Sequence, residues 1–282
     1  MTDEIVLRAS MTPEAEDCEL RAIAKVARRQ IEAAGFRLRR SPRAVGALVG
    51  SATHRAAQIS LEERLVSGSL PPLSVATDAA HEYLVIALNE GETLFGPPTF
   101  NRDDAAKQTL ALTRLYHREV APQIRPVHVE ERLEAELAPG IVVSGQPDQV
   151  AREPDSIVDL KTGLRLRNYN AQIGTYSLLA RSNGLAIKIG RIDFLKRVGT
   201  GKPQPPPATS KTPLLLAEER ARDILHRLAR DWIAFRDGSA ERGLGRHDPR
   251  AFSANPHSIL CSPKYCPAHG TEFCQAWRLN EQ

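Results

Sequence analysis

The middle of the sequence predicts two strands joined by a tight turn, which commits this part of the chain to a β-hairpin. Residues 141–150 are β-rich, and residues 156–161 contain a short apolar run. The intervening Glu153-Pro154-Asp155 is typical of a turn. A hairpin centred between Glu153 and Pro154 places Asp148 directly opposite Asp159, because both are equally far from that centre.

The predicted hairpin brings two carboxylates close enough to repel each other, with Cβ atoms ~5 Å apart. Side chains two apart on a strand share a face, so Asp159 and Lys161 point the same way and Leu160 points into the opposite layer. A divalent cation relieves such repulsion, and hard carboxylate oxygens suit Mg²⁺ or Mn²⁺. The alternative is an exposed hairpin with a structural Asp–Lys pair.

The rest of the chain alternates between helical and strand patterns, which predicts an α/β fold. The Pro-rich residues 199–213 predict a flexible loop. Further strands are predicted over residues 127–137 and 188–198. Apolar spacing predicts helices over residues 16–34, 43–66, 76–90, 103–120, 168–183 and 215–237.

Two ordered motifs lie on the hairpin. Gly145-Gln146-Pro147-Asp148 is followed after ten residues by Asp159-Leu160-Lys161. Together they resemble the signature of the PD-(D/E)XK nucleases, including its Pro-Asp pair.

Two further motifs extend this resemblance. Gln172 and Tyr176 share one helix face and are similar to the Gln-x-x-x-Tyr motif of the RecB-like branch. Gly50 and His54 resemble the Gly-x-x-x-His motif of the same branch. The chain is therefore similar to the RecB-like PD-(D/E)XK nucleases over about residues 15–280.

The resemblance implies a restriction-endonuclease-like core, in which helices flank a mixed sheet. We expect a single domain over residues 1–282, with an N-terminal helical part (1–125), a catalytic core (126–198), the Pro-rich loop (199–213) and a C-terminal helix with a cysteine loop (214–282). The resemblance also implies roles for particular residues. His54, Asp148, Asp159 and the Leu160 backbone carbonyl would bind the metal, Lys161 would serve the attacking water, and Gln172 and Tyr176 would shape the site and contact DNA.

Two other acidic residues precede the hairpin. Glu130 and Glu131 are predicted on the strand before it, where one of them could face the site. Because Glu134 and Glu136 follow closely, solvated strand positions are the favoured interpretation for both.

Three of the four cysteines, Cys261, Cys266 and Cys274, lie near the C-terminus with the spacing C-x4-C-x7-C. Four cysteines are too few for a disulfide scaffold in 282 residues. The resemblance implies that Cys18 joins them around a 4Fe–4S cluster that latches the two ends of the domain. In the alternative, His269 replaces Cys18 in a local Cys₃His zinc site. The cysteine gaps are longer than the C-x2-C-x5-C common in the family.

The formal net charge of +4 conceals a strong segregation of charge. Residues 21–43 hold eight basic residues and one acid, and residues 161–202 hold nine and one. Residues 44–160 between them hold nine basic and seventeen acidic residues. This pattern is expected of a site that binds phosphate beside metal-binding carboxylates. No apolar run is long enough to span a membrane and no signal peptide is evident, so we expect a cytoplasmic protein.

The resemblance implies metal-dependent hydrolysis of phosphodiester bonds in DNA. We expect an exonuclease that acts on linear or single-stranded DNA ends in recombination or repair, phage systems included, alongside other recombination or repair proteins. The alternatives are an endonuclease, a catalytically inactive DNA-binding or assembly module of the same fold, and a metal-cluster redox protein.

Overall fold

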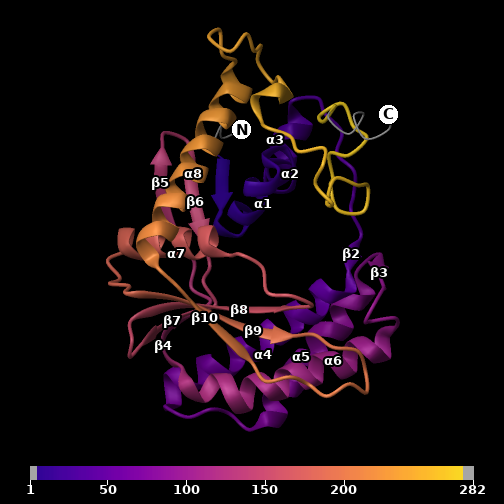
Figure 1. Ribbon diagram of the computed structural model, residues 1–282, viewed down its shortest axis with the longest axis vertical. Helices are drawn as coiled ribbons and strands as arrows, with labels where there is room; N and C mark the ends of the chain where they lie inside the picture. The colour runs from indigo at the N-terminus through magenta and orange to yellow at the C-terminus, as the bar shows by residue number, and fades with distance from the viewer. Residues whose placement is uncertain (1–4, 276–282) are drawn as a thin grey trace.

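The computed structural model (Figure 1) describes residues 5–275 of the chain, so both ends of the expected domain lie outside the described residues. Its strands are β1 (Ile5–Arg8), β2 (Arg43–Ala44), β3 (Thr93–Leu94), β4 (Arg125–Val129), β5 (Leu133–Ala138), β6 (Ile141–Gly145), β7 (Gln149–Arg152), β8 (Ser156–Gly163), β9 (Ile189–Lys196) and β10 (Ala208–Thr212). Its α-helices are α1 (Thr12–Asp17), α2 (Glu19–Val26), α3 (Arg28–Ala33), α4 (Val45–Ser67), α5 (Leu73–Asn89), α6 (Arg102–Leu115), α7 (Asn170–Ser182) and α8 (Leu214–Asp237). A π-helical turn at Tyr116–Val120 continues α6.

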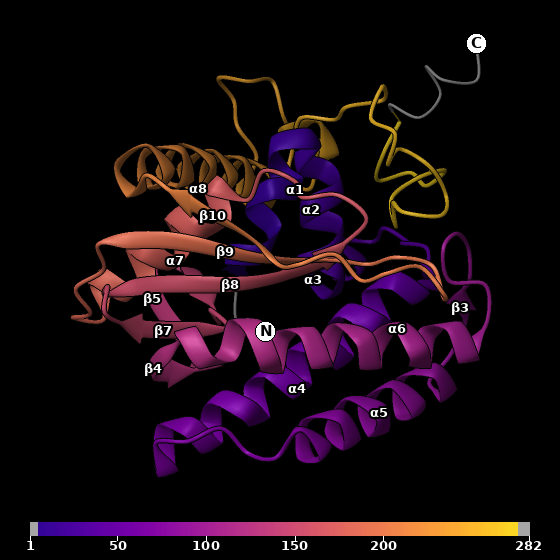
Figure 2. The ribbon, with the colours of Figure 1, turned by 60° about the horizontal axis from the view of Figure 1, so that its bottom comes forward.

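The larger sheet is mixed, as predicted, and has the strand order β10-β9-β8-β7-β4. Strands β8 and β9 run parallel, whereas the other neighbouring pairs are antiparallel. A smaller sheet has the order β1-β6-β5, in which β1 is parallel to β6. Helices α4, α5 and α6 lie on one side of the larger sheet, and α7 and α8 lie on the other (Figure 2).

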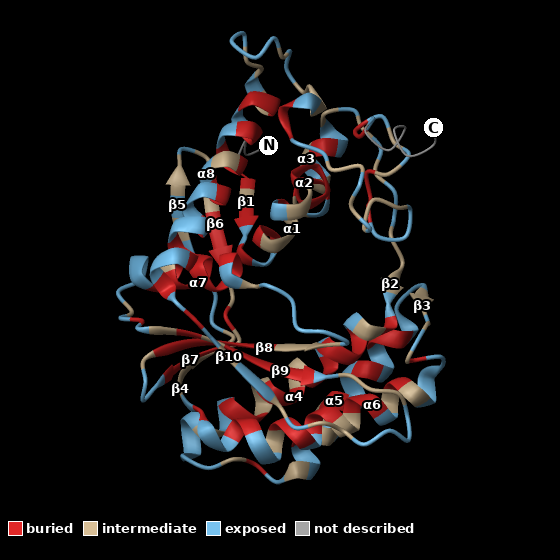
Figure 3. Cartoon of the chain, in the orientation of Figure 1, coloured by how far each residue is buried: buried red, intermediate tan, exposed pale blue. Residues whose placement is uncertain are grey.

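Two hydrophobic cores form on the two faces of the larger sheet (Figure 3). Val158 and Leu160 of β8 pack with the buried side chains of α4, α5 and α6. Ile157 of the same strand packs into the core that contains α7 and α8. This alternation is the predicted one, and it leaves Asp159 and Lys161 on the face opposite Leu160.

The hairpin of β7 and β8 has the predicted register. Gln149 pairs with Val158 and Ala151 pairs with Ser156, so the next opposed pair is Asp148 and Asp159. Asp148 itself lies one residue before β7, where the chain has just left β6, rather than on a strand. The two aspartates therefore meet where the hairpin opens.

Several predicted elements are divided or longer in the structure. The helix predicted over residues 16–34 is three short helices, because Cys18 is extended (φ −158°) and Ala27 leaves helical geometry. The strands predicted over residues 127–137 and 141–150 are two strands each. Part of the predicted loop 199–213 forms β10, whose backbone pairs with the otherwise open edge of β9.

The N-terminal helices are held against the C-terminal loop, and Figures 1 and 2 show these segments side by side. The buried Glu19 carboxylate accepts a hydrogen bond from the Ser253 backbone N–H at 3.0 Å. The Asp17 carboxylate accepts one from the Ser258 hydroxyl at 2.6 Å. Segments far apart in sequence are thereby connected. None of the helices in residues 5–275 is both long and apolar enough to cross a membrane.

Candidate active site

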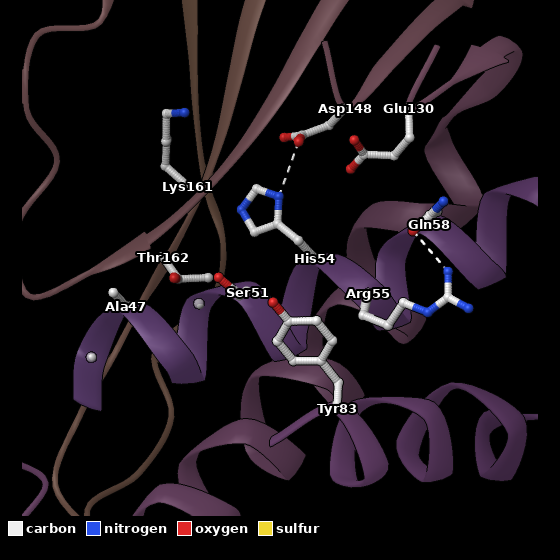
Figure 4. A pocket seen from close by; sticks show the side chains of 12 residues that line it. Ala47, Ser51, His54, Arg55, Gln58, Tyr83, Glu130, Asp148, Lys161 and Thr162 are labelled. Carbon is white, nitrogen blue, oxygen red and sulfur yellow. Dashed lines mark hydrogen bonds and ion pairs between the residues drawn. The ribbon is translucent and has the colours of Figure 1, made fainter. Parts of the chain in front are cut away.

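A pocket of about 460 Å³ lies between α4 and the open end of the hairpin (Figure 4). Helix α4 contributes one wall, which includes His54 and Arg55. Asp148 and Lys161 come from the hairpin, and Glu130 comes from the turn between β4 and β5. The pocket thus collects one imidazole, two carboxylates and one ammonium group from segments that are distant in sequence.

His54, Glu130 and Asp148 form a compact group of ligand atoms at the centre of this pocket. One ligand atom from each residue lies within 4.8 Å of the other two. The His54 Nδ1 atom is 3.0 Å from Asp148 Oδ1, and the side chains point toward one another in Figure 4. An imidazole nitrogen and two carboxylate oxygens are a suitable donor set for a divalent cation.

Asp159 and Lys161 lie beside this group and contact each other. The Lys161 Nζ atom is 2.6 Å from Asp159 Oδ2, and both side chains are largely buried. The Asp148 carboxylate accepts a hydrogen bond from the backbone N–H of Leu160, which fixes its position against β8. The ligand atoms of Asp159 are not part of the compact group formed by His54, Glu130 and Asp148.

Burial and charged neighbours shift the pKa of each of the three carboxylates. Burial and the neighbouring Asp148 raise the pKa of Glu130 to about 7. Burial likewise raises the pKa of Asp159 to about 6, against the opposing effect of Lys161. Burial would also raise the pKa of Asp148, but His54 and Lys161 outweigh it and the pKa is lowered. A bound cation would stabilise the ionised form of each carboxylate.

The pKa values of the two basic groups, His54 and Lys161, are both raised by the neighbouring carboxylates. Burial lowers the pKa of His54, but the adjacent Asp148 outweighs burial and the pKa is raised. For Lys161, the attraction of Asp159 and Asp148 also exceeds the effect of burial, so its pKa is raised. In the absence of a metal, both groups therefore hold their protons more firmly than usual.

A glycine on α4 allows His54 to reach Asp148. A Cβ atom at Gly50 would lie 2.7 Å from the Thr162 Oγ1 atom of β8, closer than real Cβ contacts. The absent side chain lets α4 approach the strand closely. His54 lies one helical turn further along α4 and therefore projects over the hairpin.

Gln172 and Tyr176 are near the site but do not line the pocket. The Gln172 Nε2 atom donates to the Tyr176 hydroxyl at 2.9 Å, and each residue is only 5% exposed. Burial, together with Asp159 and Asp148, raises the pKa of Tyr176 well above its usual value. Gly145 accommodates this tyrosine, because a Cβ there would lie 2.9 Å from Tyr176 Cδ1. The pair is therefore buried close to Asp159 and Asp148, outside the pocket lining.

Glu130 corrects an expectation from the sequence. The favoured interpretation placed it on a solvated strand, but it lies in the turn between β4 and β5 and faces the pocket. Its backbone has a positive φ of 51°, which redirects the side chain out of the strand alternation. Glu131 is exposed and pairs with His128, and Glu134 and Glu136 are also exposed, as expected. The sequence does not indicate a positive φ here, because the residue is not a glycine.

The four cysteines converge on a second, small cavity. Cys18 at the start of α2, Cys261, Cys266 and Cys274 line it together with His269. Among the described residues these four cysteines form no disulfide, and burial raises the pKa of Cys266 to about 11. Within residues 5–275, no three of these five groups bring their ligand atoms within 4.8 Å of one another. A tetrahedral zinc holds its sulfur ligands about 4 Å apart, given Zn–S bonds of about 2.3 Å.

Comparisons with known proteins agree with this architecture. A solved structure from Eubacterium rectale, described as a "Putative exonuclease", is 14% identical and covers 81% of each chain with a TM-score of 0.51. The structure of SSO0001 is 16% identical over 70% of this chain and 78% of that chain, but its TM-score of 0.28 supports no argument. No curated protein sequence matches the chain.

The profile of the PD-(D/E)XK nuclease superfamily matches residues 11–271 and so includes the four nuclease motifs between Gly50 and Tyr176, whereas Cys274 lies beyond the match. With the E. rectale structure, this match establishes the α/β, restriction-endonuclease-like fold. The chain belongs to the PD-(D/E)XK nuclease superfamily.

Proposed function

We propose that this protein is a Mg²⁺- or Mn²⁺-dependent DNA exonuclease of the RecB-like branch. The observation that carries the proposal is the convergence of His54, Glu130 and Asp148, with ligand atoms within 4.8 Å of one another, beside Asp159 and Lys161. An idle DNA-binding module has no need for three ligands and a buried lysine in one pocket.

The residues present fit a divalent cation. Burial and the nearby Asp148 both raise the pKa of Glu130, and a bound cation would offset the cost of ionising it. We propose His54, Glu130 and Asp148 as ligands. Asp159 and the Leu160 carbonyl would join them in the arrangement implied by the family motif. When bound, the cation supplies Lewis-acid stabilisation of the negative charge on the phosphoryl oxygens.

The side chains then share the remaining work of hydrolysis. Lys161 Nζ, held by Asp159, orients the attacking water and offsets charge on the phosphoryl group. The water oxygen forms a bond to phosphorus while the bond from phosphorus to the 3′ oxygen breaks. The water proton ends on the leaving oxygen, so the products are a 5′-phosphate and a 3′-hydroxyl. Gln172 and Tyr176 support this arrangement from α7.

We also propose a 4Fe–4S cluster on Cys18, Cys261, Cys266 and Cys274. Two observations support it over zinc: Cys18 lines the same cavity as the three C-terminal cysteines, and the ligand atoms are spread more widely than one zinc ion requires. The cluster would hold α1–α3 against the C-terminal loop, where Leu20 and Ser253 already share a backbone hydrogen bond of 3.1 Å. It would thereby join both ends of a single domain.

The proposed activity is tested with end-labelled linear DNA and the same DNA as a closed circle, each with Mg²⁺ or Mn²⁺. We expect the linear form to be degraded and the circle to persist, with no cleavage in EDTA. Cleavage of the circle would instead support an endonuclease. Absence of cleavage of either DNA would favour a DNA-binding module.

The close approach at Gly50 gives a prediction about site geometry. Gly50→Ala is expected to lower kcat by about 100-fold, because a displacement of α4 by about 1 Å moves His54 relative to Asp148. Thr162→Ala removes the atom that the new methyl group would meet. The double variant should therefore recover most of the activity, measured against Thr162→Ala alone. A double variant as slow as Gly50→Ala would contradict this explanation.

An absorption spectrum distinguishes the two alternatives at the cysteines, the iron–sulfur cluster and the zinc site. Protein purified without oxygen is expected to absorb in a broad band near ~400 nm, to contain about four iron atoms per chain and to lose the band in Cys18→Ser. A His269→Ala variant should retain the band, because histidine is not a ligand of the proposed cluster. A colourless protein that contains zinc, and loses it in His269→Ala, would refute the cluster.

A further inference from the structure

A groove of about 830 Å³ adjoins the active-site pocket and leads from it toward the cysteine loop. Parts of three loops line it, within residues 94–97, 162–169 and 259–265, together with the start of α4 and Arg197. The groove and the pocket share Gly46, Ala47 and Thr162. A ligand that occupies this basic groove can therefore extend directly into the proposed catalytic site.

The charge of the basic groove is entirely positive. Four cations line it and no aspartate or glutamate does; the cations are Arg165, Arg167, Arg197 and Lys264. Among residues 5–275, none of these four cations has a carboxylate oxygen within 4.0 Å, unlike Arg181, which pairs with Glu218 at 2.9 Å. Several cations without carboxylate partners in one groove suit a ligand that carries several phosphates.

Arg197 illustrates how the fold keeps one of these charges available. Its guanidinium donates to the Thr99 hydroxyl, and its partly buried Nε atom has no hydrogen-bond partner among the described residues. A Cβ at Gly46 would lie 2.4 Å from Arg197 Nη2, so the glycine leaves room for the guanidinium beside α4. Burial without a carboxylate partner lowers the pKa of Arg197. An anionic ligand would offset the energetic cost of burying this positive charge.

Aromatic and apolar side chains line the basic groove together with the cations. Tyr265 and Phe95 are each 38% exposed, and Tyr169 also lines the basic groove. Lys161 lies over the Tyr169 ring, 4.8 Å from its centre, which places this aromatic side chain directly beside the proposed catalytic lysine. Accessible aromatic side chains and cations in one groove are the features that stack unpaired bases and bind their phosphates.

We propose that the basic groove binds single-stranded DNA and guides one strand into the active site; this inference rests on the proposed nuclease function. In a duplex the bases are stacked inside and the phosphates face outward, so Tyr265 and Phe95 would meet charged backbone instead of base faces. A single strand presents both its phosphates and its unstacked base faces. The cations bind its phosphates, and the aromatic rings stack on its bases.

The proposal gives the cysteine loop a second role. Lys264 and Tyr265 lie between Cys261 and Cys266, so the segment that would hold the cluster also forms one wall of the basic groove. Lys264 lies 5.2 Å from the centre of the Tyr265 ring, so a charge and a stacking surface occupy the same wall. The loop thus positions substrate-binding residues in addition to connecting the chain ends.

Binding is measured first, without cleavage, by fluorescence anisotropy of a labelled 20-nucleotide thymidine strand in Ca²⁺, and then of a 20-base-pair duplex. The wild-type protein is expected to bind the single strand at least about 10-fold more tightly. Arg167→Gln/Lys264→Gln should weaken this binding and reduce the slope of log K against log salt by about 1.4, since two phosphate contacts are lost. Lys211→Gln, an exposed cation on β10 outside the groove, is the matched control and should change neither quantity.

Stacking is tested separately from charge. Tyr265→Ala is expected to weaken single-strand binding by about 10-fold without changing the salt slope. Equal affinity for the duplex, a double variant that behaves like Lys211→Gln, or a Tyr265→Ala variant with wild-type affinity would each refute the basic groove as a single-strand site. Preferential binding of the single strand by a wild-type protein that cleaves no DNA would support the groove while refuting the nuclease activity.

Discussion

Replacing Asp148 with asparagine is expected to lower the kcat of DNA hydrolysis by at least about 1000-fold. The carboxylate contacts His54 Nδ1 at 3.0 Å, and it accepts the backbone N–H of Leu160. Asparagine has nearly the same shape but no charge, so it retains the local packing while removing the negative charge that the proposed cation needs. Single-turnover cleavage of labelled linear DNA measures the loss.

Asp155→Asn is the matched control for this variant. Asp155 lies in the turn of the same hairpin, but its partner is the exposed Lys188, at 2.9 Å. This variant should retain wild-type kcat, and both variants should unfold close to the wild-type Tm. Titration with Mn²⁺ should show weakened metal binding only for Asp148→Asn. Wild-type cleavage by Asp148→Asn would exclude the pocket as the catalytic centre.

The second large effect is on stability and concerns the contact between α7 and α8. A Cβ atom at Gly174 would lie 2.0 Å from the Ala217 carbonyl oxygen and 2.3 Å from its carbon. These are backbone atoms and cannot rotate away, so Gly174→Ala must separate the helices. The separation would also disturb the buried Glu218 carboxylate, which accepts the Ser177 hydroxyl at 2.6 Å. We expect a loss of about 3 kcal/mol of unfolding free energy and a Tm lower by about 10 °C.

Gly96→Ala provides the comparison for this prediction. Nothing lies within 4 Å of a Cβ at Gly96 and its φ is not in the left-handed range, so its Tm should remain within about 2 °C of wild type. Thermal unfolding followed by circular dichroism distinguishes the two variants. A Gly174→Ala protein as stable as Gly96→Ala would mean that α7 and α8 do not cross as closely as described.

The hairpin and its two aspartates could be predicted because their information is local. A turn at Glu153-Pro154 and the two-residue period of strands are sufficient to place Asp148 opposite Asp159. Helix α4 could likewise be predicted from apolar spacing. The approach of His54 to this hairpin was expected only through a family resemblance, since no periodicity relates residues so far apart.

Other features depend on tertiary geometry and carry no local signal. Glu130 faces the site because its backbone leaves the strand with a positive φ. A glutamate in the sequence does not indicate such a backbone conformation. The basic groove combines three distant loops, although the basic block that supplies Arg165, Arg167 and Arg197 is evident in the sequence. Strand β10 forms because β9 offers a free edge, which outweighs the loop-like composition around it.

The meeting of Cys18 with the last three cysteines has a consequence for synthesis on the ribosome. A nascent chain that has reached residue 200 already contains every residue of the proposed catalytic site. Its α1–α3 segment nevertheless cannot form its contacts with Ser253, Ser258 and the C-terminal cysteines, because these residues are synthesised later. Insertion of the proposed cluster can therefore occur only after Cys274 has emerged, and a bound cluster would mark chains whose translation has passed that residue.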